Sequence, residues 1–248
     1  MGQKSRINKY IALCGVCSRR AAEKLISEKR VSVNGEILQE LGRTIDHDLD
    51  SVEVDGSEIR PEKIQEYILL NKPHLALSTV TDPHGRPTVM QLLEKVPAGE
   101  HAPGRVYPVG RLDFDTEGVL LLTNDGGLAH RLTHPRYEIR KVYEALVEGE
   151  FTPACARKIA GGVELEDGHR GHAETRQIGS DGKNSIVEIV LTEGHKHEVK
   201  QLLAACDLPT LHLRRLSFAG LRVDELKSGK WRRLKKAEIS ALRRQVGL

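Results

Sequence analysis

The chain has 248 residues, of which 39% are hydrophobic and 29% are charged, and this balance is typical of a globular protein long enough for more than one domain. Its four cysteines are too few and too scattered for a disulfide framework, so we expect a reducing compartment, the cytoplasm. The first residues lack the apolar core of a signal peptide, and no apolar run approaches the roughly 18 residues of a membrane helix. We therefore expect neither a secreted nor a membrane protein.

The net charge of +3 conceals an uneven distribution. Residues 1–30 carry eight Lys and Arg against two acids, and residues 194–248 carry thirteen against five. Between them, residues 31–60 are strongly acidic and residues 61–193 slightly acidic. Two basic blocks around an acidic middle suit a polyanionic partner held at two places, although solvated basic helices give the same pattern.

The first 60 residues predict a small module of two helices and a hairpin. Apolar residues recur at helical spacing from residue 5 to residue 30, with Gly15 ending the first helix and Ser18 capping the second. Asn34-Gly35 between alternating residues indicates a hairpin, and a further strand is expected over residues 51–59.

After a polar linker, strands and helices follow without a strict strand–helix–strand rhythm, which favours an α+β fold. Asp125-Gly126 is expected to form a closing turn. Strands are predicted at 66–73, on both sides of an acidic turn within 105–124, and at 141–149, 184–194 and 211–221, and helices within 82–96 and at 128–135, 151–163 and 197–207.

The acidic turn lies in the stretch GRLDFDTEGVLLLTNDGG, residues 110–127, where three acids run directly into four apolar residues. A calcium loop is rejected, because its twelfth position should be Glu and is Asn124. A phosphotransferase motif based on Asp113 and Asp115 is weakened by Glu117, where Thr or Val is usual. A lone nucleophilic carboxylate and a purely structural charged turn remain open.

The same stretch closely resembles the signature GRLDxDTxGLLLLTNDG of RNA pseudouridine synthases, in the branch that modifies ribosomal RNA. The segments ILLNKP, DPHGRPTV, RKVYEALVEG and EGHKHEVKQLLAACDLPTLHLRRLSFAGL resemble further segments of that branch in the same order. SRRAAEKLISEKRVSVNG resembles part of an S4 RNA-binding domain. The resemblance implies an S4-like domain at 1–60, a linker at 61–66 and a catalytic domain at 67–248 with a mixed, mainly antiparallel β-sheet and flanking helices.

The resemblance also implies roles for individual residues. Asp113 corresponds to the catalytic aspartate, Tyr143 to the tyrosine that stacks on the target base, and Lys200 to the cation paired with the aspartate. Residues expected to contact RNA are Arg19, Arg20, Lys24, Arg30, Asn34, Arg111, Arg214 and Arg215. Two departures make the pairing of Lys200 less secure: Glu198 replaces a usual Gln, and His195 and His197 replace Asn- or Tyr-type residues.

Isomerising uridine breaks the N1–C1′ bond, turns the uracil over and joins C5 to C1′, with no redox change. We therefore expect no metal, cofactor or nucleotide. The carboxylate could attack the sugar or base, stabilise charge at C1′, or remove the 2′ proton, and the sequence does not choose among these. A buried Asp113 would tend to stay protonated, so Lys200 or Arg111 should hold it ionised.

The resemblance predicts an enzyme that acts on ribosomal RNA, or on a ribosome-assembly intermediate, with the large subunit favoured. We expect a monomer, although the sequence leaves the oligomeric state open. Two alternatives stand beside it: a catalytically silent RNA-binding protein on the same scaffold, and a metal-dependent phosphotransferase using both aspartates. The Cys14/Cys17 and His130/His134 pairs have metal-like spacing, but neither has the further ligands of a known site, so structural roles are expected.

Overall fold

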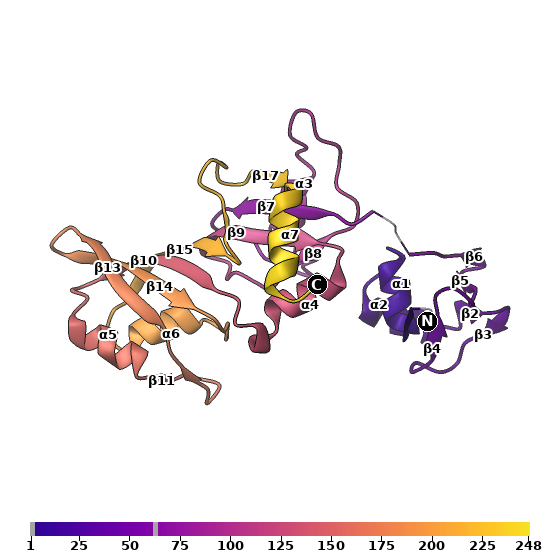
Figure 1. Cartoon of the computed structure of the whole chain (residues 1–248), viewed down its shortest axis with the longest axis horizontal. Coiled ribbons are helices and arrows are strands. Elements are labelled where there is room, and N and C mark those ends of the chain that lie inside the picture. Colours follow the sequence, from indigo (N-terminus) through magenta and orange to yellow (C-terminus); the bar gives the residue numbers. More distant parts are fainter. Residues whose placement is uncertain (1–2, 62–63) are drawn as a thin grey trace. The chain divides into compact units, whose positions relative to one another are not determined.

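The computed structural model describes residues 3–61 and 64–248. The chain divides into two compact units, Met1–Gln65 and Glu66–Leu248, each described here by itself (Figure 1). The linker expected at 61–66 includes residues 62 and 63, which lie outside the described residues.

The first unit packs two helices against short strands around one apolar core. Ser18 begins the second helix, where its hydroxyl accepts a hydrogen bond from the backbone N–H of Ala21 at 3.2 Å, so the predicted cap is confirmed. The elements are β1 (Lys4–Arg6), α1 (Ile7–Leu13), α2 (Arg19–Ser27), β2 (Val31–Val33), β3 (Glu36–Ile37), β4 (Thr44–Asp46), β5 (Val52–Val54) and β6 (Ser57–Glu58).

The predicted hairpin at Asn34-Gly35 is confirmed, since β2 and β3 pair in antiparallel register across it. The single strand expected over residues 51–59 is instead a second hairpin, β5–β6, that turns at Asp55-Gly56. The pairing of β2 with β5 joins the two hairpins into a four-stranded sheet.

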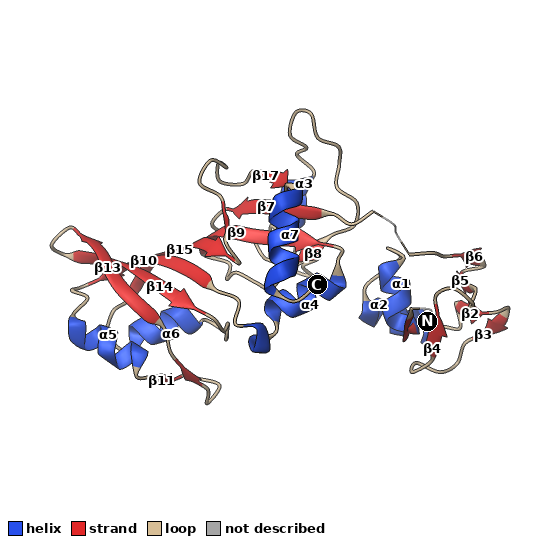
Figure 2. Cartoon of the chain, viewed as in Figure 1, coloured by secondary structure: helices blue, strands red, loops and turns tan. Residues whose placement is uncertain are grey.

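The second unit is built on one large sheet, whose main path runs β13-β14-β10-β15-β9-β7-β17 (Figure 2). All its pairings are antiparallel except that of β15 with β9, which confirms the predicted mainly antiparallel α+β fold. The elements are β7 (Tyr67–Lys72), α3 (Val89–Leu93), β8 (Tyr107–Pro108), β9 (Thr116–Thr123), α4 (Gly126–Thr133), a 3₁₀ turn (Pro135–Tyr137), β10 (Lys141–Glu148), α5 (Pro153–Ala160), β11 (Val163–Glu164), β12 (Arg170–Gly171), β13 (Glu174–Ser180), β14 (Asn184–Leu191), α6 (Glu198–Ala204), β15 (Thr210–Phe218), β16 (Leu221–Arg222), β17 (Trp231–Arg233) and α7 (Lys236–Gln245).

The apolar run Val119–Leu122 is buried because β9 is covered on both faces. Leu120 and Leu122 belong to a core shared with helices α3, α5 and α6, whereas Val119 and Leu121 belong to a core shared with α4 and α7. Successive side chains of a strand point to opposite faces, so a strand inside two cores must be apolar at every position.

The closing turn expected at Asp125-Gly126 is wrong, because Asp125 is the N-cap of helix α4. Its carboxylate accepts hydrogen bonds from the backbone N–H groups of Gly127 and Leu128 at 3.1 and 3.0 Å. Arg243 of α7 donates to the same carboxylate at 2.7 Å, which ties the last helix to the start of α4. An Asp-Gly pair serves a cap as well as a turn, and the local sequence does not separate the two.

Candidate active site

A cavity of about 260 Å³ lies in the second unit. Its walls come from segments far apart in the sequence: the turn around Asp113, the start of β10, the segment between β14 and α6, and β15. Asp113, Tyr143 and Lys200, the three residues predicted for catalysis, all line it.

Asp113 belongs to a tight turn that leads into β9. Its carbonyl oxygen accepts a hydrogen bond from the N–H of Thr116 at 3.1 Å. On the other side, the hydroxyl of Ser78 bonds both the carbonyl oxygen and the N–H of Leu112, at 3.0 and 3.2 Å. The Asp113 side chain keeps 28% of its surface exposed, so it can meet a substrate in the cavity.

Lys72, at the end of β7, stabilises the same turn through hydrogen bonds to its backbone. Its ammonium donates to the carbonyl oxygens of Thr116, Pro73 and Phe114 at 2.6, 3.1 and 3.3 Å, and the residue is fully buried. Burial lowers the pKa of Lys72 to about 8, although the nearby carboxylates, Asp115 first among them, act to raise it. The turn is therefore fixed by a cation that solvent does not reach.

Gly118 allows β9 to approach β15 closely. Its φ of +103° favours glycine, and a Cβ atom there would lie 2.2 Å from the carbonyl oxygen of Arg215. The Arg215 side chain crosses to β9, where Nε donates to the carbonyl oxygen of Val119 at 2.8 Å. Its guanidinium lies 4.9 Å from the ring centre of Phe218.

Arg215 is 2% exposed and lines the cavity. Its Nη2 atom is buried and has no hydrogen-bond partner in the part of the chain that the structure describes. A buried guanidinium nitrogen without an acceptor is costly, so this atom is a candidate to bind an acceptor on a substrate.

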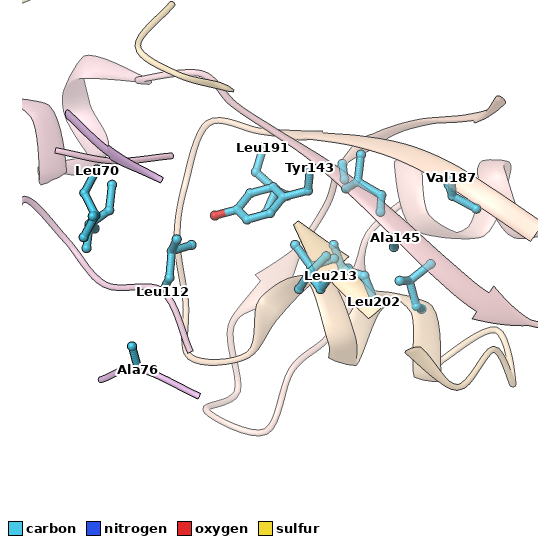
Figure 3. Close-up of a cluster of buried hydrophobic side chains, with 14 of the residues drawn as sticks. Leu70, Ala76, Leu112, Tyr143, Ala145, Val187, Leu191, Leu202 and Leu213 are labelled. Carbon is cyan, nitrogen blue, oxygen red and sulfur yellow. The ribbon is translucent and has the colours of Figure 1, made fainter. Parts of the chain in front are cut away.

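Tyr143 lies on β10, opposite Ile189 of β14 and Arg215 of β15. It is 8% exposed, and its ring packs in the apolar cluster with its hydroxyl at the Leu112 end (Figure 3). The sheet thus places the Tyr143 ring in the same cavity as Asp113, 30 residues earlier in the chain.

Lys200 of α6 bonds Asp115 more closely than Asp113. Its Nζ lies 2.6 and 2.8 Å from the two carboxylate oxygens of Asp115, and 4.0 Å from the nearer oxygen of Asp113. Burial alone would raise the pKa of Asp115, but the hydrogen bond from Lys200 gives a net lowering. Lys200 therefore lies near both carboxylates, but its hydrogen-bond acceptor is Asp115 and not Asp113, the partner that was expected.

His197 supplies a second nitrogen beside Asp113, with Nε2 3.6 Å from Oδ1. The buried carboxylate of Glu198 accepts a hydrogen bond from the backbone N–H of His195 at 2.8 Å, and within the described residues it forms no ion pair with Lys200. Lys141 also lines the cavity, and burial lowers its pKa to about 8, with Arg215 adding to the effect.

Of the residues predicted to contact RNA in this unit, Arg111 and Arg215 line the cavity and Arg214 does not. Arg215 and Leu213 share the face of β15 that meets the cavity, and alternation turns Arg214 to the other face.

In the first unit, Arg19, Arg20 and Lys24 are exposed on α2, and within the described residues Arg19 and Arg20 form no ion pair. Arg30 is held by Asp55 at 2.7 and 2.8 Å. The Asn34 side chain donates to Asp50 and accepts from the N–H of Ser51, both at 2.9 Å. These last two side chains therefore have structural partners, whereas the α2 arginines face solvent.

Sequence reasoning gave no role to Lys72, Lys141 or Gly118. Lys72 falls in the quoted segment ILLNKP, but a lysine at the end of an apolar strand does not by itself predict burial. Gly118 had a usable signal, since a glycine inside a strand pattern often marks a close backbone approach.

The second unit brings a carboxylate, a tyrosine and several basic side chains to one cavity, and the first unit is a separate module of helices and hairpins. Both features are those expected of an RNA-modifying enzyme of the predicted class. The comparisons with known proteins agree. Residues 66–205 match the RNA pseudouridylate synthase family, and residues 5–49 match the S4 domain.

The relatives include an uncharacterized RNA pseudouridine synthase of Aquifex aeolicus, 44% identical over 98% of this chain and 95% of its own. The ribosomal large subunit pseudouridine synthase B of Bacillus subtilis is 38% identical over 96% of this chain and 95% of its own. A crystal structure of a pseudouridylate synthase superposes with a TM-score of 0.66 and 28% identity, covering 96% of this chain and 99% of the other.

The chain belongs to the RNA pseudouridine synthase family, which confirms the predicted class of enzyme. It carries an S4 domain before the catalytic one. Within residues 3–61 and 64–248, every helix is too short or too polar to cross a membrane.

Proposed function

We propose that this protein isomerises a specific uridine of ribosomal RNA, in the large subunit, with Asp113 as the catalytic carboxylate. The proposal is carried by one observation: Asp113 and Tyr143, placed by different strands, line a single cavity. The 38% identity to a relative named for the large ribosomal subunit supports the choice of RNA.

The size of the cavity favours a single nucleotide. At about 260 Å³ it lies just below the range of about 300–1,000 Å³ of common small-molecule pockets, which suits one flipped nucleotide better than a duplex. The target uridine must leave its stack, at a cost of a few kcal/mol. Stacking on the Tyr143 ring would recover about 1–3 kcal/mol of this.

Basic side chains surround Asp113 in the cavity. Lys200 and His197 lie within 4.0 Å of its oxygens, and Lys72 holds the backbone of the turn. In our proposal Asp113 acts on the sugar or the base, and Nη2 of Arg215 donates a hydrogen bond to a carbonyl or phosphate oxygen of the flipped nucleotide.

We further propose that the S4 domain grips RNA through α2, where Arg19 and Arg20 face solvent. Arg111 would contact RNA at the cavity. The protein would act as a monomer in the cytoplasm, without a nucleotide or other cofactor in the reaction.

The test is tritium release from ribosomal RNA labelled at uridine C5, in EDTA, comparing wild type with Asp113→Asn. Asp115→Asn is the matched control, because it removes a carboxylate two residues away whose principal partner is Lys200. We expect release by wild type and, more slowly, by the control, and none by Asp113→Asn.

A phosphotransferase using Asp113 and Asp115 would release no tritium from uridine C5, and its Mg²⁺-dependent transfer of phosphate would stop in EDTA. The structure argues against it, because Lys200 already occupies the space between the two carboxylates. No release from naked RNA or from assembly intermediates would leave a silent RNA-binding protein.

A further inference from the structure

Three side chains with metal-ligating atoms meet at the edge of the cavity: His169, Glu193 and His195. Nε2 of His169 and Nε2 of His195 lie 2.9 and 3.4 Å from the same carboxylate oxygen of Glu193. The three donor atoms all lie within 4.8 Å of one another, and no other such group occurs in the described parts of the chain.

A fourth residue, Asp167, orders both histidines. One carboxylate oxygen lies 2.8 Å from Nδ1 of His195, and the other accepts a hydrogen bond from the backbone N–H of His169 at 3.0 Å. In metal sites, a carboxylate on the far nitrogen of a ligating imidazole fixes its tautomer and raises its basicity. Asp167 takes this position toward His195.

Because Asp167 lies against Nδ1 of His195, Nε2 is the ring nitrogen left for an ion, and it lies 3.4 Å from an oxygen of Glu193. The two imidazole rings are stacked, with centres 3.8 Å apart and planes 10° from parallel, so each ring must turn about its Cβ–Cγ bond before the Nε2 lone pair, which lies in the ring plane, points to a shared ion. One divalent cation would satisfy both rings and the carboxylate.

We propose that His169, Glu193 and His195 form a binding site for a divalent transition-metal ion, with Zn²⁺ the best fit. Two imidazoles and one carboxylate are a zinc donor set, and Zn–N and Zn–O distances of about 2.0–2.1 Å give a tetrahedral edge of about 3.3 Å. The observed separations of 2.9 and 3.4 Å bracket that edge. Glu193 and Asp167 together balance the charge of the ion.

The ion would join two segments that the backbone leaves apart. His169 belongs to the hairpin β11–β12, and His195 to the loop that leads into α6. Two residues further along that loop, His197 lies beside Asp113. The ion would therefore fix the rim of the cavity and stabilise the fold, without taking part in the isomerisation.

The test is a calorimetric titration of the full-length, chelator-treated protein with ZnCl₂. We expect one binding site in the wild type and at least tenfold weaker binding in the double variant His169→Ala, His195→Ala. His172→Ala, an exposed histidine one residue beyond the hairpin, is the matched control and should bind as the wild type does. The conservative variant Asp167→Asn should bind about 10–100-fold more weakly.

Thermal unfolding supplies a second readout. Zinc should raise the midpoint of the wild type and of His172→Ala, but not of the double variant. The variant Cys14→Ser, Cys17→Ser should keep the site, which separates it from binding by thiols. Equal zinc binding by wild type and double variant, or no binding by wild type at millimolar zinc, would overturn the proposal. Neither outcome bears on uridine isomerisation, which is measured in EDTA.

Discussion

Replacing Gly118 by alanine tests how closely strands β9 and β15 must approach for the site to form. The new Cβ would lie 2.2 Å from the carbonyl oxygen of Arg215, whereas real Cβ contacts are essentially never below 3.0 Å. The strands must therefore separate by most of an ångström. Since Asp113 lies on the turn before β9, and a misplacement of about 1 Å can cost about 100-fold in rate, we expect a loss of that size.

Gly182→Ala is the matched control. Gly182 has a φ of +84°, but a Cβ there would meet nothing within 4 Å, so this variant carries the backbone strain without the clash. Such strain costs about 1–2 kcal/mol of unfolding free energy. We expect urea denaturation to show that loss for Gly182→Ala, and about 2 kcal/mol more for Gly118→Ala because of the added clash.

Single-turnover tritium release then separates stability from chemistry, since it is measured under conditions where both variants are folded. Gly182→Ala should react at the wild-type rate, and Gly118→Ala about 100-fold more slowly. Equal rates and equal stabilities for the two variants would show that the close contact between β9 and β15 at Gly118 does not position Asp113.

Three further predictions concern charge. The pKa of Lys72 is about 8 in the folded protein against a usual 10.5, so the unfolded chain binds more protons between those pH values. The unfolding free energy of wild type should therefore rise by about 3 kcal/mol from pH 8 to 10.5 because of this group, and urea titrations of Lys72→Met should lack that rise. Identical pH slopes for the two proteins would contradict the burial of the charge. The lowered pKa of Asp115 contributes stability that is present above the usual value of 3.8 and is lost as the pH falls through the lowered folded value. Lys200→Met should therefore be less stable than wild type by up to about 1 kcal/mol at pH 7, and the difference should shrink as the pH falls below 3.8. A difference that stays constant with pH would exclude the ion pair as its cause. The affinity for single-stranded RNA should fall as salt rises, and the variant Arg19→Ala, Arg20→Ala should reduce the slope of log affinity against log salt concentration by about 1.4, at about 0.7 per phosphate contact. An unchanged slope would show that α2 is not part of the RNA-binding surface.

The sequence predicted those parts of the fold where periodicity or turn chemistry is strong. The N-cap at Ser18 and the hairpin at Asn34-Gly35 lie as expected. Helix α7 and strand β17 were not predicted, because residues 231–236 read as a basic block whose charges mask the buried Trp231 and Leu234. A short strand that forms only by pairing with β7, more than 150 residues away, leaves little local signal.

The candidate site shows where residue identity stops being informative. The resemblance predicted an ion pair between Asp113 and Lys200. Asp115, two residues after Asp113, is also within reach of the Lys200 side chain, so only the packing of α6 decides which carboxylate Lys200 bonds. In the same way, Arg214 and Arg215 are equivalent in the sequence. The face of β15 that each occupies depends on the neighbouring strands.

The junction of acids and leucines in residues 110–127 has a physical explanation in the two cores around β9. A strand buried on both faces cannot shift without disturbing both, so the turn at its start is held as firmly as the sheet itself. Each acid of the turn lies near a basic side chain: His197 beside Asp113, Lys200 beside Asp115, and His212 3.4 Å from Glu117. Lys72 binds the carbonyl oxygens between them. The apolar run thus fixes the position of Asp113, and a basic side chain stands beside each acid at the point where the turn meets the core.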